Sequence, residues 1–207
     1  MKTLLHISSS IFLENGQSSQ LANRLVEQWR KANPRGRVVV RDLAAEPLPH
    51  LDAARFGAFL AKPEARSAAQ AAIIAHSDAL IQELKAADVV VLGLPMYNFG
   101  IPSTLKAYFD HIARAGVTFS YTEKGPVGLL TGKQVYVFAA RGGVYLGTPN
   151  DTHTAYLRQF LGFLGMTDVE FIYAEGLATE SKEASLRKAH AQIDSHRERL
   201  DAPAFAA

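Results

Sequence analysis

The chain has 207 residues, 48% of them hydrophobic and 20% charged, which is enough to bury the core of one generously sized α/β domain. Its formal net charge is only +2 and its basic residues are spread along the chain, which argues against a nucleic-acid-binding surface. It has no cysteine, which excludes disulfides, thiolate metal sites and cysteine nucleophiles and agrees with a cytoplasmic location.

Five short apolar runs predict strands. The first, residues 3–8, imitates a signal peptide, but His6 and a run of serines interrupt it and no small-residue cleavage site follows. We therefore expect a buried strand there, and no apolar run reaches the length of a membrane span. The other strands are predicted over residues 37–41, 89–94, 134–139 and 169–173. Continuous β-branched runs are typical of a parallel sheet that is covered on both faces.

Helical periodicity fills the segments between these strands. It predicts residues 18–33, a helix capped by Ser77, a helix opened by Pro102 and Ser103, residues 152–164, and a polar surface helix over residues 182–200. The tail, residues 201–207, is expected to be loose. Two stretches exceed ordinary loops: residues 43–76, expected to be partly helical, and residues 117–133, expected to form a hairpin or lid.

This alternation predicts one α/β domain spanning residues 1–207. Its core is a three-layer, doubly wound, five-stranded parallel sheet of order 2-1-3-4-5 with right-handed crossovers. Ligands of such sheets bind beyond the carboxyl ends of the strands, where the strand order reverses. The loops after the first, third and fourth strands are therefore the candidate site.

The loop after the first strand is rich in hydroxyl groups and opens a helix. Ser10, Gly16, Gln17 and Ser18 lie in it, and the free N–H groups of a helix N-terminus attract phosphate. The loop has no Lys or Arg and matches neither a Walker motif nor a dinucleotide-binding glycine motif. It indicates a monophosphate held by neutral donors or, alternatively, an ordinary serine-rich turn.

The loop after the third strand is aromatic. Met96, Tyr97 and Phe99 offer a wall to a flat heteroaromatic ring, and Asn98 offers an amide to its polar edge. The alternative is an apolar plug that closes the end of the sheet.

After the fourth strand, Ala140 and Arg141 lead into Gly142 and Gly143. Two glycines allow backbone conformations that aim successive N–H groups at an acceptor edge that becomes negative on reduction. Arg141 either adds charge there or pairs with a surface carboxylate. A phosphate site, an aromatic wall and a donor cluster together match FMN better than a free nucleotide or a sugar phosphate.

Four segments resemble the family of FMN-dependent NADH-azoreductases, also described as NADH:quinone oxidoreductases: residues 96–99, 113–119, 141–143 and 160–165. The resemblance runs from the first strand to about Gly176. It implies a flavodoxin-like fold and a ping-pong enzyme in which NADH or NADPH reduces bound FMN and leaves before the acceptor enters. It also implies a homodimer with active sites at the subunit interface.

The resemblance also assigns residues by position. It places Ser10 and residues 16–18 at the phosphate and ribityl chain, residues 96–99 along the flavin, and residues 140–143 at its pyrimidine edge. Tyr121 and Phe163 correspond to aromatic residues that shape the acceptor pocket, whereas the sequence pattern alone makes them core or lid residues. Many relatives carry serine in place of Gly16 and Ala140, and two missing hydroxyls are expected to weaken FMN binding by about 10- to 30-fold.

The expected acceptors are flat and electron-poor: quinones, azo dyes and nitroaromatics. Because the flavin carries the chemistry, we expect no catalytic side chain and no metal, and we interpret His76, His111 and His153 as surface or packing residues. The preference between NADH and NADPH is left open. The alternative function is a non-catalytic electron carrier of the flavodoxin type, although such carriers are strongly acidic and this chain is slightly basic.

Overall fold

The central sheet of the protein has five parallel strands in the order β2-β1-β3-β6-β7. The computed structural model describes residues 1–196. The strands are β1 (Thr3–Ser8), β2 (Arg37–Asp42), β3 (Val89–Pro95), β6 (Gln134–Ala140) and β7 (Asp168–Ala174). Each lies within one residue of its predicted ends, and the predicted 2-1-3-4-5 order of the main sheet is confirmed.

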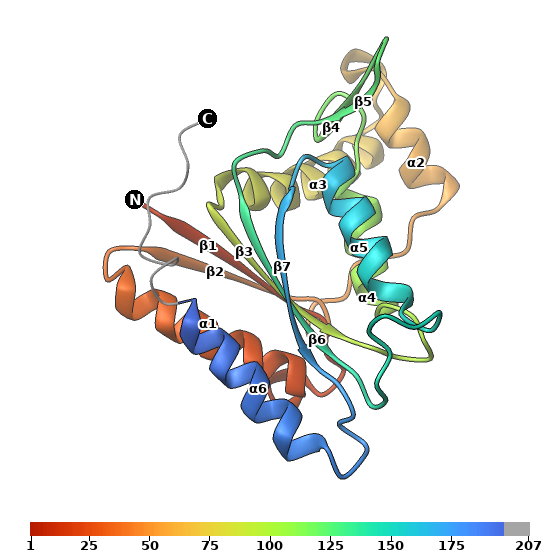
Figure 1. The fold of residues 1–207 in the computed structure, drawn as a ribbon. Coiled ribbons are helices and arrows are strands. Elements are labelled where there is room, and N and C mark those ends of the chain that lie inside the picture. Colours follow the sequence, from red (N-terminus) through yellow and green to blue (C-terminus); the bar gives the residue numbers. More distant parts are fainter. Residues whose placement is uncertain (197–207) are drawn as a thin grey trace.

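Helices cover both faces of this sheet (Figure 1). One face carries α1 (Gln17–Ala32) and α6 (Lys182–Ser195), and the other carries α3 (Ala68–Ala86), α4 (Ser103–Ile112) and α5 (Thr152–Phe163). Successive strand residues alternate between the two cores: Leu4 packs with α1 and Leu5 packs with α3 and α4. Since both sides of each central strand are buried, the strands read as continuous apolar runs.

The helices end close to where the sequence predicts. On α1, Leu21, Leu25 and Trp29 recur at a spacing of four and are at most 1% exposed, so the helix presents one apolar stripe to the sheet. The predicted C-terminal helix is described as far as Ser195. The remainder of that prediction and the predicted loose tail lie outside the described residues. Within residues 1–196, no helix combines the length and apolar character required to cross a bilayer.

The predicted cap of α3 is wrong. The helix begins nine residues earlier than Ser77, at Ala68, behind a capping box in which Ser67 Oγ accepts from Gln70 N and Gln70 Oε1 accepts from Ser67 N. Ser77 lies inside the helix and donates its hydroxyl to the His111 carbonyl, at 2.6 Å. The stretch predicted to be partly helical also contains α2 (Ala53–Leu60) and a 3-10 turn, η2 (Pro63–Ala65).

The predicted hairpin is present as β4 (Phe119–Thr122) and β5 (Gly125–Gly128). It packs against the end of α5, because a Cβ atom on Gly128 would lie 2.0 Å from the Gly165 nitrogen. Leu130 N also donates to the Leu164 carbonyl, at 2.8 Å. The hairpin therefore sits at the amino edge of the sheet, where β6 and β7 begin.

Candidate functional site

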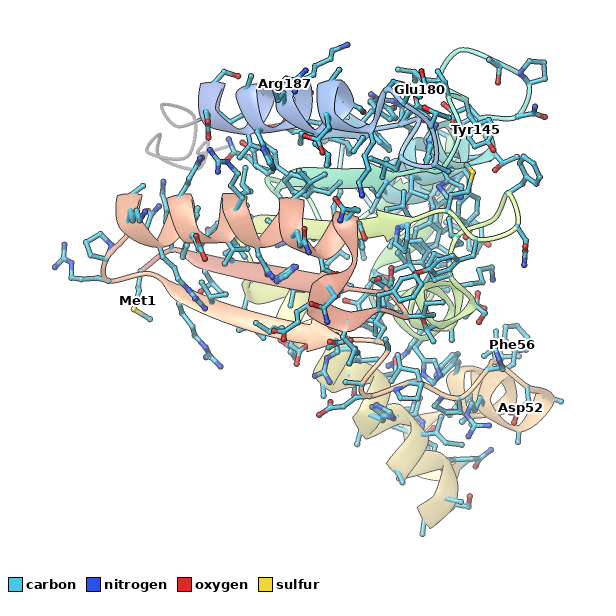
Figure 2. All side chains as sticks on the ribbon, turned by 90° about the horizontal axis from the view of Figure 1, so that it is seen from below. Met1, Asp52, Phe56, Tyr145, Glu180 and Arg187 are labelled. Atoms are coloured by element: carbon cyan, nitrogen blue, oxygen red, sulfur yellow. The ribbon has the colours of Figure 1, made fainter. Side chains whose placement is uncertain are left out.

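Three loops follow the carboxyl ends of β1, β3 and β6, and we name them the β1 loop (residues 9–16), the β3 loop (residues 96–102) and the β6 loop (residues 141–151). They lie side by side because Met96 N donates to the Ala140 carbonyl at 3.0 Å and Ile11 N donates to the Tyr97 hydroxyl at 3.1 Å. Figure 2 shows Tyr145, in the β6 loop, at the opposite end of the molecule from Met1. The sequence prediction of one shared edge therefore agrees with the geometry.

The β1 loop ends in a helix N-terminus with unused donors. It contains a short 3-10 helix, η1 (Leu13–Asn15), and Gly16 then caps α1. The hydroxyl of Ser18 is buried, and no atom of residues 1–196 forms a hydrogen bond with it. The first N–H groups of an α-helix have no partner within the helix. The loop carries no basic residue, so its field comes from neutral dipoles, which suits a dianionic phosphate.

Ser9, Ser10 and Gly16 shape this loop. Ser9 Oγ donates to the Gly93 carbonyl at 2.8 Å, and Ser10 Oγ accepts from Phe12 N at 3.2 Å. A Cβ atom on Gly16 would lie 2.1 Å from Ser10 Oγ. The Ser10 hydroxyl thus occupies the space that a side chain at position 16 would need, so the glycine permits a close approach.

The β3 loop contains a strained turn. Tyr97 N donates to the Gly100 carbonyl at 3.1 Å and Gly100 N donates back at 2.9 Å. Between them, Asn98 (φ 51°) and Phe99 (φ 59°) are both left-handed, the geometry of a type I′ turn. A bulky residue rarely adopts this conformation and stays there only when its surroundings enforce it.

Two residues of later elements hold Phe99 in place. The hydroxyl of Thr152, the first residue of α5, donates to the Phe99 carbonyl. The Tyr145 ring packs edge-on against the Phe99 ring, with centroids 5.6 Å apart. Phe99 still keeps 54% of its surface exposed, so its ring forms a wall at the sheet edge. Beside it, a cavity of about 480 Å³ opens between Phe99, Lys106 and Tyr156.

The β6 loop presents two unused donors. Within the described chain, the N–H groups of Gly142 and Gly143 form no hydrogen bond, while their carbonyls accept from Ala178 N (3.0 Å) and Gly176 N (2.9 Å). Neither glycine has a positive φ, so left-handed conformation is not why they are glycines. A Cβ atom on Gly143 would lie 2.6 Å from the Tyr145 ring, so close packing is the reason at that position.

Arg141 lies beneath this loop, and neither sequence-based alternative describes it. Its guanidinium is fully buried and donates to Glu175 Oε1 at 3.0 Å and Asp151 Oδ1 at 2.8 Å. It also lies over the Tyr173 ring, 5.2 Å from the centroid. The partner carboxylates are themselves almost buried, so the pairing is internal and the guanidinium offers no free charge at the sheet edge.

Tyr121 and Phe163 are not brought to the three loops. They lie with Phe119 in an aromatic cluster on the hairpin, with Phe119 centroids 5.5 Å from Tyr121 and 4.4 Å from Phe163. Phe163 ends α5 and Thr152 begins it, which separates the cluster from the β3 loop by about 17 Å of helix. Tyr121 is 75% exposed, so its ring is free to meet another surface.

The histidines interpreted as surface or packing residues behave differently from one another. His111 and His153 are at most 1% exposed, and burial lowers the pKa of each below its usual value. Both are therefore neutral packing residues at physiological pH. His76 lies on the exposed side of α3, with its ring 5.8 Å from that of His111.

Four supporting residues were missed at the sequence level: Tyr145, Asp151, Thr152 and Glu175. Thr152 was placed only at a helix start, and Asp151, which caps that helix, carries a common N-cap signal. Glu175 directly succeeds the fifth strand. A charged residue at the carboxyl end of a parallel strand is a signal of the same kind as those in the other three loops, and it could have found Glu175.

The strand order and the donor-rich loops at the point where that order reverses define a protein with a flavodoxin-like fold. A family model described as "Flavodoxin-like fold" matches residues 2–197, so the chain belongs to this family. The curated relatives are more specific. The FMN-dependent NADH:quinone oxidoreductase of Cellvibrio japonicus is 59% identical over 194 residues, which are 94% of this chain and 98% of the relative. That of Alcanivorax borkumensis is 55% identical over 92% of this chain and 97% of the relative.

Solved structures of azoreductases are also similar to this chain. An azoreductase from Bacillus anthracis is 28% identical with a TM-score of 0.85, covering 97% of this chain and 99% of that one. An FMN-dependent NADH-azoreductase from the same species, in complex with FMN, is 26% identical with a TM-score of 0.89, covering 98% and 100%. The predicted membership of the azoreductase and NADH:quinone oxidoreductase family is confirmed.

Proposed function

We propose that the protein is an FMN-dependent oxidoreductase that uses NADH or NADPH to reduce quinones and azo compounds by a ping-pong mechanism. The observation that carries the proposal is that three adjoining loops present unpaired donors and an exposed aromatic wall at one sheet edge. The Ser18 hydroxyl at the start of α1 is buried and has no hydrogen-bond partner among residues 1–196, so it is free to donate to a phosphate oxygen. The names of the relatives, which specify FMN, NADH and quinone, support the same function.

The residues present fit FMN, and each group has a role that its chemistry allows. FMN, when bound, supplies hydride and electron transfer. Ser10, Gly16, Gln17 and Ser18 would hold its phosphate and ribityl chain. Met96, Tyr97, Asn98 and Phe99 would line the ring, and Ala140, Gly142 and Gly143 would face the pyrimidine edge. Arg141 would support this edge from beneath, because its N–H and carbonyl are bonded to Ala174 and Leu177 and its guanidinium to Asp151 and Glu175.

The N–H groups of Gly142 and Gly143 are the electrostatic part of the site. Fixed donors aimed at an edge that gains negative charge stabilise the charged form without reorganising. Because the flavin carries the chemistry, no side chain needs to act as an acid or base. His111 and His153 are also poor candidates for proton donors, since both are buried and burial lowers the pKa of each. Phe99 and the cavity beside it offer a flat apolar surface for quinones, azo dyes and nitroaromatics.

The active site would be completed by a second copy of the chain. Tyr121 and Phe163, which the resemblance assigns to the acceptor pocket, lie at the far end of α5 within their own chain. Exposed apolar side chains surround this region, including Tyr121 (75%), Val127 (48%) and Leu129 (45%). A homodimer would bring these residues over the partner's loops. Light scattering should therefore give twice the monomer mass. A cytoplasmic location is a separate proposal, which fractionation of cells tests.

A single experiment separates the proposal from its rival, the flavodoxin-type carrier. The purified protein is loaded with FMN, and its flavin absorbance is followed anaerobically as NADH and then a quinone is added. We expect bleaching by NADH alone and recovery on adding the quinone. An FMN-loaded protein that neither NADH nor NADPH bleaches would be a carrier, and a protein that fails to bind FMN would refute both functions.

A further inference from the structure

A buried cluster of three charges lies directly beneath the β6 loop. Arg141, whose side chain is fully buried, sits between Asp151 (8% exposed) and Glu175 (12% exposed), at 2.8 and 3.0 Å. Two carboxylates and one guanidinium leave the cluster with one net negative charge. Burying such ions costs much of what their attraction returns, so stability alone is a weak reason for them.

Glu175 also binds the backbone of the β6 loop, in addition to its ion pair with Arg141. Its Oε1 atom accepts three hydrogen bonds: from Arg141 Nη1 at 3.0 Å, from Tyr145 N at 2.9 Å and from Leu146 N at 2.9 Å. The next residue, Gly176, donates its N–H to the Gly143 carbonyl at 2.9 Å. The residues at the end of β7 therefore hold the β6 loop by hydrogen bonds on both sides of Val144, next to the N–H groups of Gly142 and Gly143.

The same cluster extends to the β3 loop. Asp151 caps α5 by accepting from Thr154 N at 3.1 Å, and it accepts from Arg141 Nη2. Its neighbour Thr152 donates to the carbonyl of the strained Phe99. One buried group of charges thus fixes the aromatic wall and the two glycine donors relative to each other.

We propose that Glu175 is a positioning residue: its carboxylate oxygen holds the β6 loop so that the N–H groups of Gly142 and Gly143 stay aimed at the flavin's pyrimidine edge. The inference rests on the proposed function, since it takes the flavin as the ligand of these donors. Glu175 accepts hydrogen bonds from Arg141, Tyr145 and Leu146, and it acts on the flavin only through these residues.

Two substitutions of Glu175 separate the effect of the hydrogen-bonding oxygen from the effect of the negative charge. Glu175→Gln and Glu175→Ala both remove the negative charge, but only the glutamine keeps an oxygen that accepts from Tyr145 N and Leu146 N. We expect Glu175→Ala to bind FMN about tenfold more weakly than Glu175→Gln, by analogy with the loss of residues that orient the ligands of a metal ion. The flavin midpoint potential should also be lower in Glu175→Ala, because loosened donors stabilise less charge on the reduced ring.

The matched control is Glu180, an exposed carboxylate five residues after Glu175 in the chain, which is labelled in Figure 2. Glu180→Ala and Glu180→Gln should agree with each other in FMN affinity and in potential. Affinity is measured by fluorescence quenching as FMN is added to the apoprotein, and potential by equilibration with a reference dye.

Equal affinities and potentials for Glu175→Ala and Glu175→Gln, with FMN bound normally by the wild type, would overturn the positioning role and leave the proposed function intact. A wild type that does not bind FMN would instead refute the proposed function. If Glu175→Ala does not fold, amide hydrogen exchange of the wild-type apoprotein decides. Slow exchange at Tyr145 and Leu146 supports the proposal, and exchange at the rate of an open loop overturns it.

Discussion

The β1 loop and the β6 loop both offer hydrogen-bond donors to the proposed flavin, but the donors of the first are neutral groups, whereas the second rests on buried charges. The β1 loop has no basic residue, and Ile11 and Phe12 in it are 64% and 63% exposed. It leads into the start of α1, where the Ser18 hydroxyl has no hydrogen-bond partner within residues 1–196. The β6 loop rests on Arg141, Asp151 and Glu175, whose charges are buried and paired. A phosphate brings its own fixed charge and needs only donors, whereas a ring whose charge changes during reaction needs donors that do not move.

The largest effect should come from breaking the buried cluster. Arg141→Met would leave the Asp151 and Glu175 carboxylates without their common partner, which should lower the free energy of unfolding by about 3–5 kcal/mol. Urea unfolding of the apoprotein measures this. In the control, Arg24→Met, an exposed pair with Asp194 is lost, and about 1 kcal/mol or less is expected. Similar losses in both variants would contradict the contrast.

A second effect concerns pH and the strand that feeds the β1 loop. Burial lowers the pKa of His6 to about 4. Between pH 6.5 and 4 the unfolded chain binds a proton that folded His6 does not, so stability should fall as pH falls, by about 3 kcal/mol. Urea unfolding at pH 7 and pH 4 tests this, and His6→Leu should reduce the difference. An undiminished pH dependence in His6→Leu would show that the change arises elsewhere.

At the proposed phosphate end, two buried serines, Ser9 and Ser18, should separate FMN binding from stability. Ser18→Ala removes a buried hydroxyl that has no hydrogen-bond partner in the described part of the chain, so the stability of the apoprotein should not change. The FMN affinity should fall on the order of 10- to 100-fold, as for a lost hydrogen bond to a charged group. Ser9→Ala instead removes the bond to the Gly93 carbonyl and should cost about 1 kcal/mol of stability. FMN titration and thermal unfolding measure the two. Unchanged FMN affinity in Ser18→Ala would remove the phosphate from that position.

The smallest effect should come from relieving the turn between the two loops. Phe99→Gly and Phe99→Ala both remove the ring, but only glycine adopts a φ of 59° without strain. The glycine variant should therefore be about 1 kcal/mol more stable than the alanine variant, measured by thermal unfolding. A more stable alanine variant would mean that the turn relaxes once the ring is gone.

Much of this architecture could be predicted from the sequence because strand runs are local signals. Continuous apolar stretches such as that of β3 located the strands, and their alternation with helices indicated a doubly wound parallel sheet. The order 2-1-3-4-5 is one of the common orders of such sheets, and the structure has it. The loops that carry the candidate site followed from that order alone. The start of α3 was missed because Ser77 was favoured over the capping box of Ser67 and Gln70.

The supporting structure of the site was less predictable. Arg141, Asp151 and Glu175 come from three segments, and which charges meet in a core depends on packing that no local pattern encodes. The left-handed turn at Asn98 and Phe99 had no glycine signal, because surrounding contacts enforce it. The separation of Tyr121 from the loops is likewise a property of the folded chain.

The most direct test of the account is where FMN binds on the apoprotein. Backbone amide resonances are followed by NMR as FMN is added in steps to the labelled protein. We expect the largest shifts at the N–H groups of Ser18, Phe99, Gly142 and Gly143, all reaching saturation together. Saturable binding that shifts other amides and leaves these four unmoved would contradict the claim that the three loops form one flavin site.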